Sequence, residues 1–279
     1  MVEVALVGDP VSHSLSPAIQ SAAFAARDLD WQYRLVPVPE GELGQLWPEL
    51  AQRYLGINVT SPHKQAAARL ADSLSPTAQL CASVNTVTFG AEGAFGDSTD
   101  GAGFLAALRH AGGDPPRRAV LMGTGGAARA VTVALLQEGT EVLIVGRNQV
   151  QGRVLERDLA HVGAGKVFYQ GLGPEVTAQS LVGAELLVNA TLLGGVRHPN
   201  LSPLPDHVPL RSELVVFDLV YWPRATPLGR RARAEGCRLI DGLEMLVEQG
   251  ALSFQAWTGI EPPLLEMRRA AQRATEVLA

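Results

Sequence analysis

Three polar clusters interrupt the otherwise apolar N-terminal third of the chain. They read HSLSP at 13–17, NVTSPHK at 58–64 and GDSTDGAG at 96–103. Lys64 and Asp100 are the reactive candidates among them, because a lysine can exchange a proton when its surroundings shift its pKa, and a nearby carboxylate can orient it. Each cluster lies after a predicted strand or at a helix start, where polar groups converge on ligands at the edge of a sheet. The clusters therefore predict a site for a small polar ligand.

Ordinary structural roles explain the same residues when they are taken one at a time. Asp100 can cap a helix, and Lys64 can be a surface lysine in a first helical turn. Ser16 and Ser61 each precede a proline, and a serine N-cap followed by a proline at the first helical position is a favoured helix start. We therefore predict both serines as N-caps, and only the combination of clusters indicates a reactive site.

A glycine turn in the middle of the chain matches the pattern that binds dinucleotides. It reads GTGGAA at 123–128 and lies between a predicted strand and a predicted helix. Gly123 permits the tight turn, Gly125 lets the backbone approach a pyrophosphate, and Ala128 allows close packing of helix on strand. The N–H groups at the helix N-terminus attract the phosphates. The predicted cofactor contacts in this turn are Gly123, Thr124, Gly125, Gly126 and Ala127.

The end of the next predicted strand indicates which dinucleotide is bound. About 20 residues after the glycine turn, an NAD enzyme usually carries an acid that binds the ribose 2′-hydroxyl. This chain has Gly146, Arg147 and Asn148 there instead. The guanidinium of Arg147 can hold a 2′-phosphate through charge-assisted hydrogen bonds, although a solvated surface arginine would look the same in the sequence. The missing acid favours NADP, with Arg147 and Asn148 as contacts.

The hydrophobic pattern predicts an α/β protein with two domains. In the first hundred residues, the predicted strands and helices alternate, at 2–7, 17–27, 31–38, 42–53 and 56–60. The later strands are apolar on both alternations, as in a parallel sheet that helices cover on both faces; they lie at 118–122, 141–145, 166–169, 185–190, 214–220 and 238–240.

A helix at about 102–110 connects the two patterns, and the residues after Gly242 are helical and expected to pack back on the first domain. We predict a substrate-binding and catalytic α/β domain at 1–103 and 241–279. Residues 104–240 are expected to form a Rossmann-type, doubly wound parallel-sheet domain that binds NADP.

Composition argues against several other classes of protein. The chain has 279 residues, 47% of them hydrophobic, and a net charge of -5 without a basic run, which makes nucleic acid an unlikely partner. No segment has the roughly 18 apolar residues of a membrane span, and the first apolar run is too short for a signal peptide. Cys81 and Cys237 are too isolated to predict a disulfide framework or a metal site. We expect a cytoplasmic enzyme, monomeric or homodimeric.

The whole set of motifs resembles the shikimate dehydrogenase family, and the resemblance covers nearly the entire chain. The matching segments occur in the family's order: GDPVSHSLSP, GINVTSPHK, SVNT, GDSTDG, GTGGAARA, LVNATLLGG, DLVYWPRATPLGRRA and DGLEMLVEQGALSFQAWTG. The resemblance implies reversible, NADPH-dependent reduction of 3-dehydroshikimate to shikimate, a reaction of aromatic amino-acid biosynthesis.

The resemblance also implies roles for individual residues. Lys64 would be the acid and base of the reaction, and Asp100 would hold it together with a substrate hydroxyl. Ser14 and Ser16 would bind the substrate carboxylate. The residues expected to surround the ring hydroxyls and the reacting oxygen are Thr60, Lys64, Asn85, Asp100, Tyr221 and Gln249. Leu219 and Gly242 would lie near the nicotinamide.

Several positions depart from the family's usual pattern. Ser98 replaces an asparagine, Thr124 replaces an alanine of the glycine turn, and Gly195 replaces a methionine. The run 146–148, Gly-Arg-Asn, replaces Asn-Arg-Thr, which keeps the arginine but loses flanking polar partners for a 2′-phosphate.

Three other functions remain open at this point. Related family members act on quinate, on quinate and shikimate, or on an amino analogue of shikimate. A non-catalytic dinucleotide sensor would need the glycine turn but not Lys64 together with Asp100. An NADP-dependent dehydrogenase of one-carbon folate derivatives also has a lysine-bearing first domain, but it would not explain HSLSP or the segments of Tyr221 and Gln249.

Overall fold

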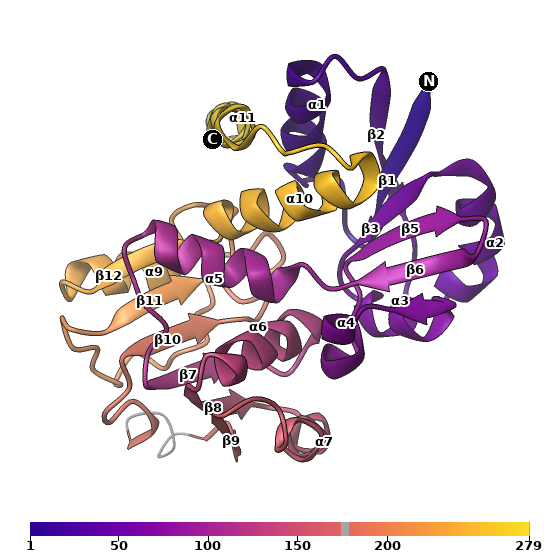
Figure 1. Cartoon of the computed structure of the whole chain (residues 1–279). Helices are drawn as coiled ribbons and strands as arrows, with labels where there is room; N and C mark the ends of the chain where they lie inside the picture. The colour runs from indigo at the N-terminus through magenta and orange to yellow at the C-terminus, as the bar shows by residue number, and fades with distance from the viewer. Residues whose placement is uncertain (174–178, 279) are drawn as a thin grey trace. The chain divides into compact units, whose positions relative to one another are not determined.

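The computed structural model describes residues 1–173 and 179–278. In chain order, its elements are β1 (Val2–Gly8), α1 (Ser16–Ala26), β2 (Trp31–Pro37), α2 (Leu43–Arg53), β3 (Gly56–Val59), α3 (Lys64–Leu70), β4 (Ser73–Leu74), α4 (Pro76–Cys81), β5 (Thr86–Gly90), β6 (Gly93–Asp97), α5 (Asp100–His110), β7 (Arg118–Met122), α6 (Gly126–Gln137), β8 (Glu141–Gly146), α7 (Gln149–Leu159), β9 (Lys166–Gly171), β10 (Leu186–Asn189), β11 (Val215–Asp218), α9 (Pro227–Ala234), β12 (Arg238–Asp241), α10 (Gly242–Thr258) and α11 (Leu264–Leu278) (Figure 1).

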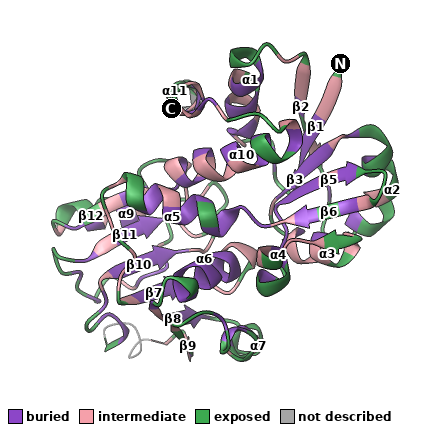
Figure 2. Ribbon diagram, in the orientation of Figure 1, coloured by how far each residue is buried: buried purple, intermediate pink, exposed green. Residues whose placement is uncertain are grey.

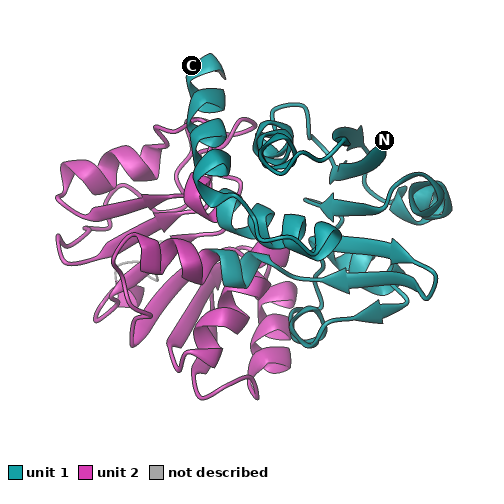
Figure 3. Ribbon diagram, turned by 45° about the horizontal axis from the view of Figure 1, so that its top comes forward, with its two compact units in different colours: residues 1–103, 246–279 teal, residues 104–245 magenta. Residues whose placement is uncertain are grey.

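The chain divides into two compact units (Figure 3). Unit 1 comprises Met1–Gly103 and Leu246–Ala279, and unit 2 comprises Phe104–Met245. Helices α5 and α10 each contain one of the boundaries. Among the residues that the structure describes, no helix is both long and apolar enough to cross a membrane.

Unit 1 contains a six-stranded mixed sheet in the order β2-β1-β3-β5-β6-β4. β1 pairs in parallel with β2 and β3, whereas β3 with β5 and β5 with β6 are antiparallel. The predicted strands of the first hundred residues are present, but the sequence pattern did not predict β4, β5 or β6. β6 reads GAFGD, and its two glycines leave little of the apolar alternation by which a strand is recognised.

The C-terminal helices of unit 1 pack on its N-terminal elements, as predicted. Phe254 of α10 stacks on Phe24 of α1, with 5.8 Å between the ring centroids. The indole of Trp257 donates a hydrogen bond to the Val87 carbonyl at 3.0 Å. A Cβ at Gly56 would lie 2.3 Å from that indole nitrogen, so only glycine allows the tryptophan to approach β3 this closely.

Unit 2 contains six parallel strands in the order β12-β11-β10-β7-β8-β9. This is the doubly wound Rossmann-type sheet that the sequence predicted. Figure 2 shows the central strands and most of α6 buried, whereas α7 carries exposed residues. In the register, Asn189 lies opposite both Met122 and Asp218, so the loops after β7, β10 and β11 leave from one edge of the sheet.

The predicted serine N-caps are wrong at both positions. α1 begins at Ser16 itself, after Leu15, and α3 begins only at Lys64, after His63. The buried His63 ring bonds to the Val38 carbonyl at 2.7 Å, which holds the residue before α3 in place. Ser61 and its proline therefore lie in the loop ahead of the helix.

Candidate active site

Lys64 and Asp100 meet in unit 1, each as the first residue of a helix. The Nζ atom of Lys64 donates a hydrogen bond to Oδ2 of Asp100 in an ion pair. The lysine side chain is 15% exposed and the aspartate side chain 5% exposed. Because the pair is shielded from bulk solvent yet keeps an opening at the lysine, it can exchange a proton with a small ligand.

Asn85 connects this ion pair to helix α10. Its Nδ2 atom lies 3.0 Å from Oδ1 of Asp100, 3.0 Å from Oε1 of Gln249 and 2.8 Å from Oγ1 of Thr99. Its Oδ1 atom accepts a hydrogen bond from the Thr99 amide at 2.8 Å. Gln249 in turn donates to the Leu246 carbonyl at 2.8 Å, so its amide is oriented from both ends. Residues far apart in the sequence thus form one polar group.

A second, deeper layer of polar residues supports Asn85, and sequence reasoning missed it. Asn58 donates to the Asn85 carbonyl at 3.1 Å and to Ser253 Oγ at 2.9 Å. The hydroxyl of Tyr33 donates to Asn58 Oδ1 at 2.8 Å. The one signal was Asn58 itself, a polar residue in the wholly buried strand β3; nothing in the sequence singles out Ser253.

The remaining substrate residues predicted in unit 1 lie in two other loops. The Ser16 amide donates to Ser14 Oγ at 3.2 Å at the start of α1. Thr60 follows β3, and its Cγ2 atom would lie 2.3 Å from a Cβ at Gly8, so the loops after β1 and β3 are in close contact. Among the described residues, no hydrogen bond links these three side chains to Lys64 or Asp100.

The glycine turn of unit 2 has the shape that a dinucleotide requires. Gly123 has φ +119°, and a Cβ there would lie 2.9 Å from the Ala190 carbonyl oxygen. Gly125 is the N-cap of α6, and a Cβ there would meet no atom within 4 Å, so open space adjoins its backbone. Gly126 and Ala127 begin the 12-residue helix, whose N–H groups favour phosphate at this end. The residues present therefore fit a pyrophosphate.

Arg147 and Asn148 follow β8 at the same edge of the sheet. Arg147 is exposed and makes no hydrogen bond or ion pair with any described residue. Asn148 is the N-cap of α7, and its Oδ1 atom accepts from the Gln151 amide at 3.0 Å. The side-chain oxygen of Asn148 thus has a local structural role, while Arg147 is available to an anion.

The other predicted residues of unit 2 follow β11 and β12. A Cβ at Gly242 would lie 2.2 Å from the Leu219 carbonyl oxygen, so the structure brings these two residues together and requires glycine at position 242. Tyr221 is half-buried in the loop after β11. The loop after β11 and the start of α10, directly after β12, lie at the edge that carries the glycine turn.

A buried carboxylate that sequence reasoning missed fixes these loops. Asp218 accepts from Asn189 Nδ2 at 2.8 Å, from Thr226 Oγ1 at 2.6 Å and from the Val220 amide at 3.1 Å. Burial raises the pKa of Asp218 above its usual range, against the opposing effect of these hydrogen bonds. The side chains of Asn189, Asp218 and Thr226 lie in the segments LVNATLLGG and DLVYWPRATPLGRRA. Only the strand register shows that these segments meet.

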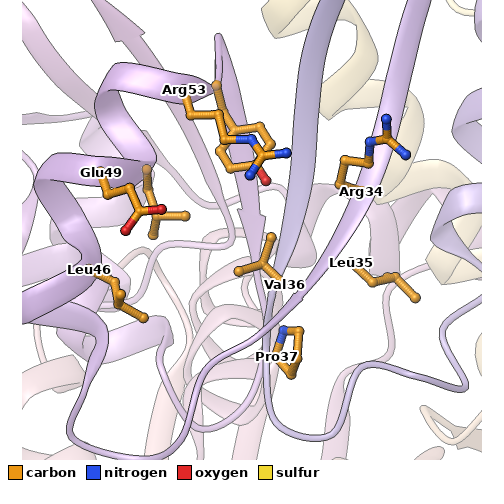
Figure 4. A pocket seen from close by; sticks show the side chains of 9 residues that line it. Arg34, Leu35, Val36, Pro37, Leu46, Glu49 and Arg53 are labelled. Atoms are coloured by element: carbon orange, nitrogen blue, oxygen red, sulfur yellow. The ribbon is translucent and has the colours of Figure 1, made fainter.

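A cavity of about 530 Å³ lies elsewhere in unit 1, between β2 and α2 (Figure 4). No predicted site residue lines it. Two of its lining residues, Arg34 and Arg53, form ion pairs with Glu3 at 2.8 and 3.3 Å, and their hydrogen bonds hold the pKa of that carboxyl below its usual range. The guanidinium groups are thus already paired. Among the described residues, no group of three or more His, Cys, Asp or Glu side chains could hold a metal ion.

Comparison with known proteins agrees with this arrangement. Residues 6–87 match the family model described as shikimate dehydrogenase substrate binding domain, and residues 242–272 match that of the shikimate 5′-dehydrogenase C-terminal domain. A shikimate dehydrogenase (NADP(+)) from Rubrobacter xylanophilus is 42% identical, over 96% of this chain and 94% of the relative.

Two solved structures that are similar to this chain contain bound ligands. Shikimate 5-dehydrogenase from Thermus thermophilus, in complex with NADP(H) and shikimate, is 37% identical with a TM-score of 0.86, covering 98% of this chain and 100% of the other. Quinate dehydrogenase from Corynebacterium glutamicum, in complex with NAD, is 27% identical with a TM-score of 0.86, covering 98% of this chain and 99% of the other.

Proposed function

Because this chain belongs to the shikimate dehydrogenase family, it is an NADP-dependent oxidoreductase that interconverts 3-dehydroshikimate and shikimate, and we propose that Lys64 and Asp100 carry its proton transfer. The observation that supports these roles is the shielded ion pair joined through Asn85 to Gln249. No such group would be needed by a protein that only bound a dinucleotide.

Lys64 protonates the oxygen of the ring ketone as it is reduced, and it takes the proton back in the reverse direction. Asp100 balances the charge of the ammonium group through Oδ2, while its Oδ1 stays bonded to Asn85. A proton donor held in position lowers the barrier because no separate encounter is needed when charge develops on the substrate oxygen.

The other polar groups of unit 1 hold the ring. The Asn85 and Gln249 amides and the Thr60 hydroxyl suit a polyol, because they offer both donors and acceptors. Ser14 and Ser16, at the start of α1, suit the carboxylate, since their hydroxyls and the helix N-terminus both favour negative charge. Tyr221 of unit 2 is proposed as a further substrate contact.

Unit 2 holds the coenzyme. NADPH, when bound, supplies the hydride that reduces the ketone. The glycine turn takes the pyrophosphate, Arg147 and Asn148 contact the adenosine end, and Leu219 and Gly242 lie near the nicotinamide. The open space at Gly125 and the unpaired guanidinium of Arg147 support this assignment.

The proposed roles are substrate binding and catalysis for unit 1 and coenzyme binding for unit 2. The predicted boundary between residues 240 and 241 lies five residues before the division between Met245 and Leu246. We also propose a cytoplasmic monomer or homodimer.

Quinate is the second candidate substrate, since one structural neighbour is a quinate dehydrogenase. An assay at 340 nm that crosses shikimate and quinate with NADP and NAD tests substrate and coenzyme together. We expect the highest kcat/KM with shikimate and NADP. A higher kcat/KM with quinate would reassign the substrate, and turnover only with NAD would remove Arg147 from its proposed role.

A further inference from the structure

Two departures from the family's pattern meet in a single contact of unit 2. Thr124 lies in the glycine turn after β7, and Gly146 ends β8. A Cβ at position 146 would lie 2.8 Å from Cγ2 of Thr124, closer than side chains pack, while the next residue that it meets is 3.8 Å away. Gly146 does not adopt a positive φ. Its glycine is therefore needed for space, and the methyl group of Thr124 occupies that space.

The hydroxyl of Thr124 has a separate partner. Its Oγ1 atom donates to Oε1 of Gln151 at 3.3 Å, in the first turn of α7. A side chain at position 146 would force Thr124 to rotate, and the rotation would carry the hydroxyl away from Gln151. Gly146 thus permits the side-chain conformation in which Thr124 orients the Gln151 carboxamide.

The two arginines near this contact, Arg147 and Arg153, differ in whether they have partners. Arg153 donates to Glu156 at 2.9 Å, and its guanidinium lies over the Tyr169 ring, 5.5 Å from the centroid. Tyr169 in turn donates to the Gly146 carbonyl at 2.8 Å. Arg153 is thereby held to α7 and β9, which leaves Arg147 as the unpaired cation of the described stretch 146–153.

We propose that Thr124 and Gln151 bind the phosphorylated adenosine ribose of the coenzyme beside Arg147, and that Gly146 makes room for them. The family usually has a polar residue at position 146, at the end of β8. In this chain Thr124 of the glycine turn supplies the polar group instead. The hydroxyl and the carboxamide are neutral and can bond to a phosphate oxygen or a ribose hydroxyl, so discrimination between NADP and NAD depends on Arg147 alone. This inference rests on the proposed position of the 2′-phosphate at Arg147.

Two substitutions of Thr124 separate its methyl group from its hydroxyl. Thr124→Ser keeps the hydroxyl, and we expect the dissociation constants of the full-length enzyme for NADP and NAD to stay within about twofold. Thr124→Val keeps the shape, and we expect both constants to rise about three- to tenfold, the range of one hydrogen bond. The measurement is a fluorescence titration with the reduced forms, NADPH and NADH, because only the reduced nicotinamide fluoresces. Unchanged binding by Thr124→Val would overturn the proposal.

Gly146→Ala tests the contact itself. Alone, it should weaken coenzyme binding about as much as Thr124→Val, because Thr124 must rotate. Combined with Thr124→Ser, which lacks the obstructing methyl group, it should have no further effect. If Gly146→Ala weakened coenzyme binding equally with Thr124 and with Thr124→Ser, the methyl group of Thr124 would not be the reason that position 146 requires glycine. The Thr124 variants leave Gly146 in place, so they decide the hydroxyl's role even if Gly146→Ala fails to fold.

Arg147→Ala, measured in parallel, separates this inference from the proposed function. If Arg147→Ala weakens NADP binding while Thr124→Val does not, the 2′-phosphate lies at Arg147 and the Thr124 proposal is wrong. If neither variant changes binding, the adenosine end lies elsewhere and both proposals fail.

Discussion

The polar group around Lys64 in unit 1 and the glycine turn of unit 2 are ordered by different means. In unit 1, side chains bond to side chains over long sequence separations, and Asn85 reaches Gln249, 164 residues away. In unit 2, the coenzyme turn is ordered by backbone geometry within six residues, through the positive φ of Gly123 and the N-terminus of α6. The first arrangement couples every member to its neighbours, whereas the second depends on local chain conformation. Substitutions should therefore act differently in the two units.

The largest effect is expected in unit 1. Lys64→Ala removes the proposed proton donor, and kcat should fall by about 10² to 10⁴, with only a modest change in the KM for shikimate. Steady-state kinetics with shikimate and NADP measures both constants. Lys166→Ala is the matched control, because Lys166 is the only other lysine of the sequence and is exposed on β9 of unit 2. A near-normal kcat for Lys64→Ala would remove this residue from the mechanism.

In unit 2 the expected effect is on coenzyme affinity. Arg147→Ala should raise the KM for NADP about 10- to 100-fold and leave the KM for NAD nearly unchanged, because only NADP carries the phosphate with which the guanidinium makes charge-assisted hydrogen bonds. Arg157→Ala is the control, since Arg157 is an exposed arginine of the following helix, α7, and is paired with Asp158. Equal effects of Arg147→Ala on both coenzymes would mean that Arg147 does not bind the 2′-phosphate.

The same contrast explains how much of the molecule the sequence predicted. The glycine turn and the parallel strands of unit 2 are encoded locally, in GTGGAA and in runs of apolar residues, so they could be recognised from the sequence. Lys64 and Asp100 could be proposed from residue type and from the family resemblance. Their contact depends on two helix starts that lie 36 residues apart.

What the sequence did not predict depends on tertiary contacts. Ser253 looks like any helical serine until α10 packs against β3 and brings it to Asn58. The two N-cap predictions failed because Ser16 is itself the first residue of α1, and because α3 begins at Lys64, after the buried His63. The sequence alone gives no reason for a glycine at position 146. The reason appears only in the structure, where the methyl group of Thr124 occupies the space that a side chain would need.

Coupling within unit 1 predicts an intermediate effect for Gln249. Gln249→Ala removes one acceptor from Asn85, and we expect the KM for shikimate to rise about three- to tenfold with a smaller change in kcat. Gln255→Ala, at an exposed position of the same helix, is the control. The double variant with Asn85→Ala should be less impaired than the product of the single effects, because both substitutions break the same bond. Independent effects would contradict the coupled arrangement.

The smallest effect on turnover is expected at Asp218, whose influence is on stability. Burial raises the pKa of this carboxyl in the folded protein, so its contribution to the free energy of unfolding is greatest below the ordinary aspartate pKa of about 3.9 and is lost as the pH rises through the raised value. Asp218→Asn does not titrate, and its oxygen can still accept from Asn189 and Val220. The variant should therefore gain stability relative to the wild type as the pH rises.

Urea denaturation at a series of pH values from about 3.5 to 8 measures this difference. Asp158→Asn provides a control of opposite sign, because its hydrogen bond from Arg157 lowers the pKa of Asp158 and the wild type should gain stability over that variant as the pH rises. If Asp218→Asn instead lost stability relative to the wild type with rising pH, the ionised carboxylate would be the form that the loops after β10 and β11 require. Unit 2 would then depend on a buried charge as unit 1 does, and the contrast between the units would be confined to the glycine turn.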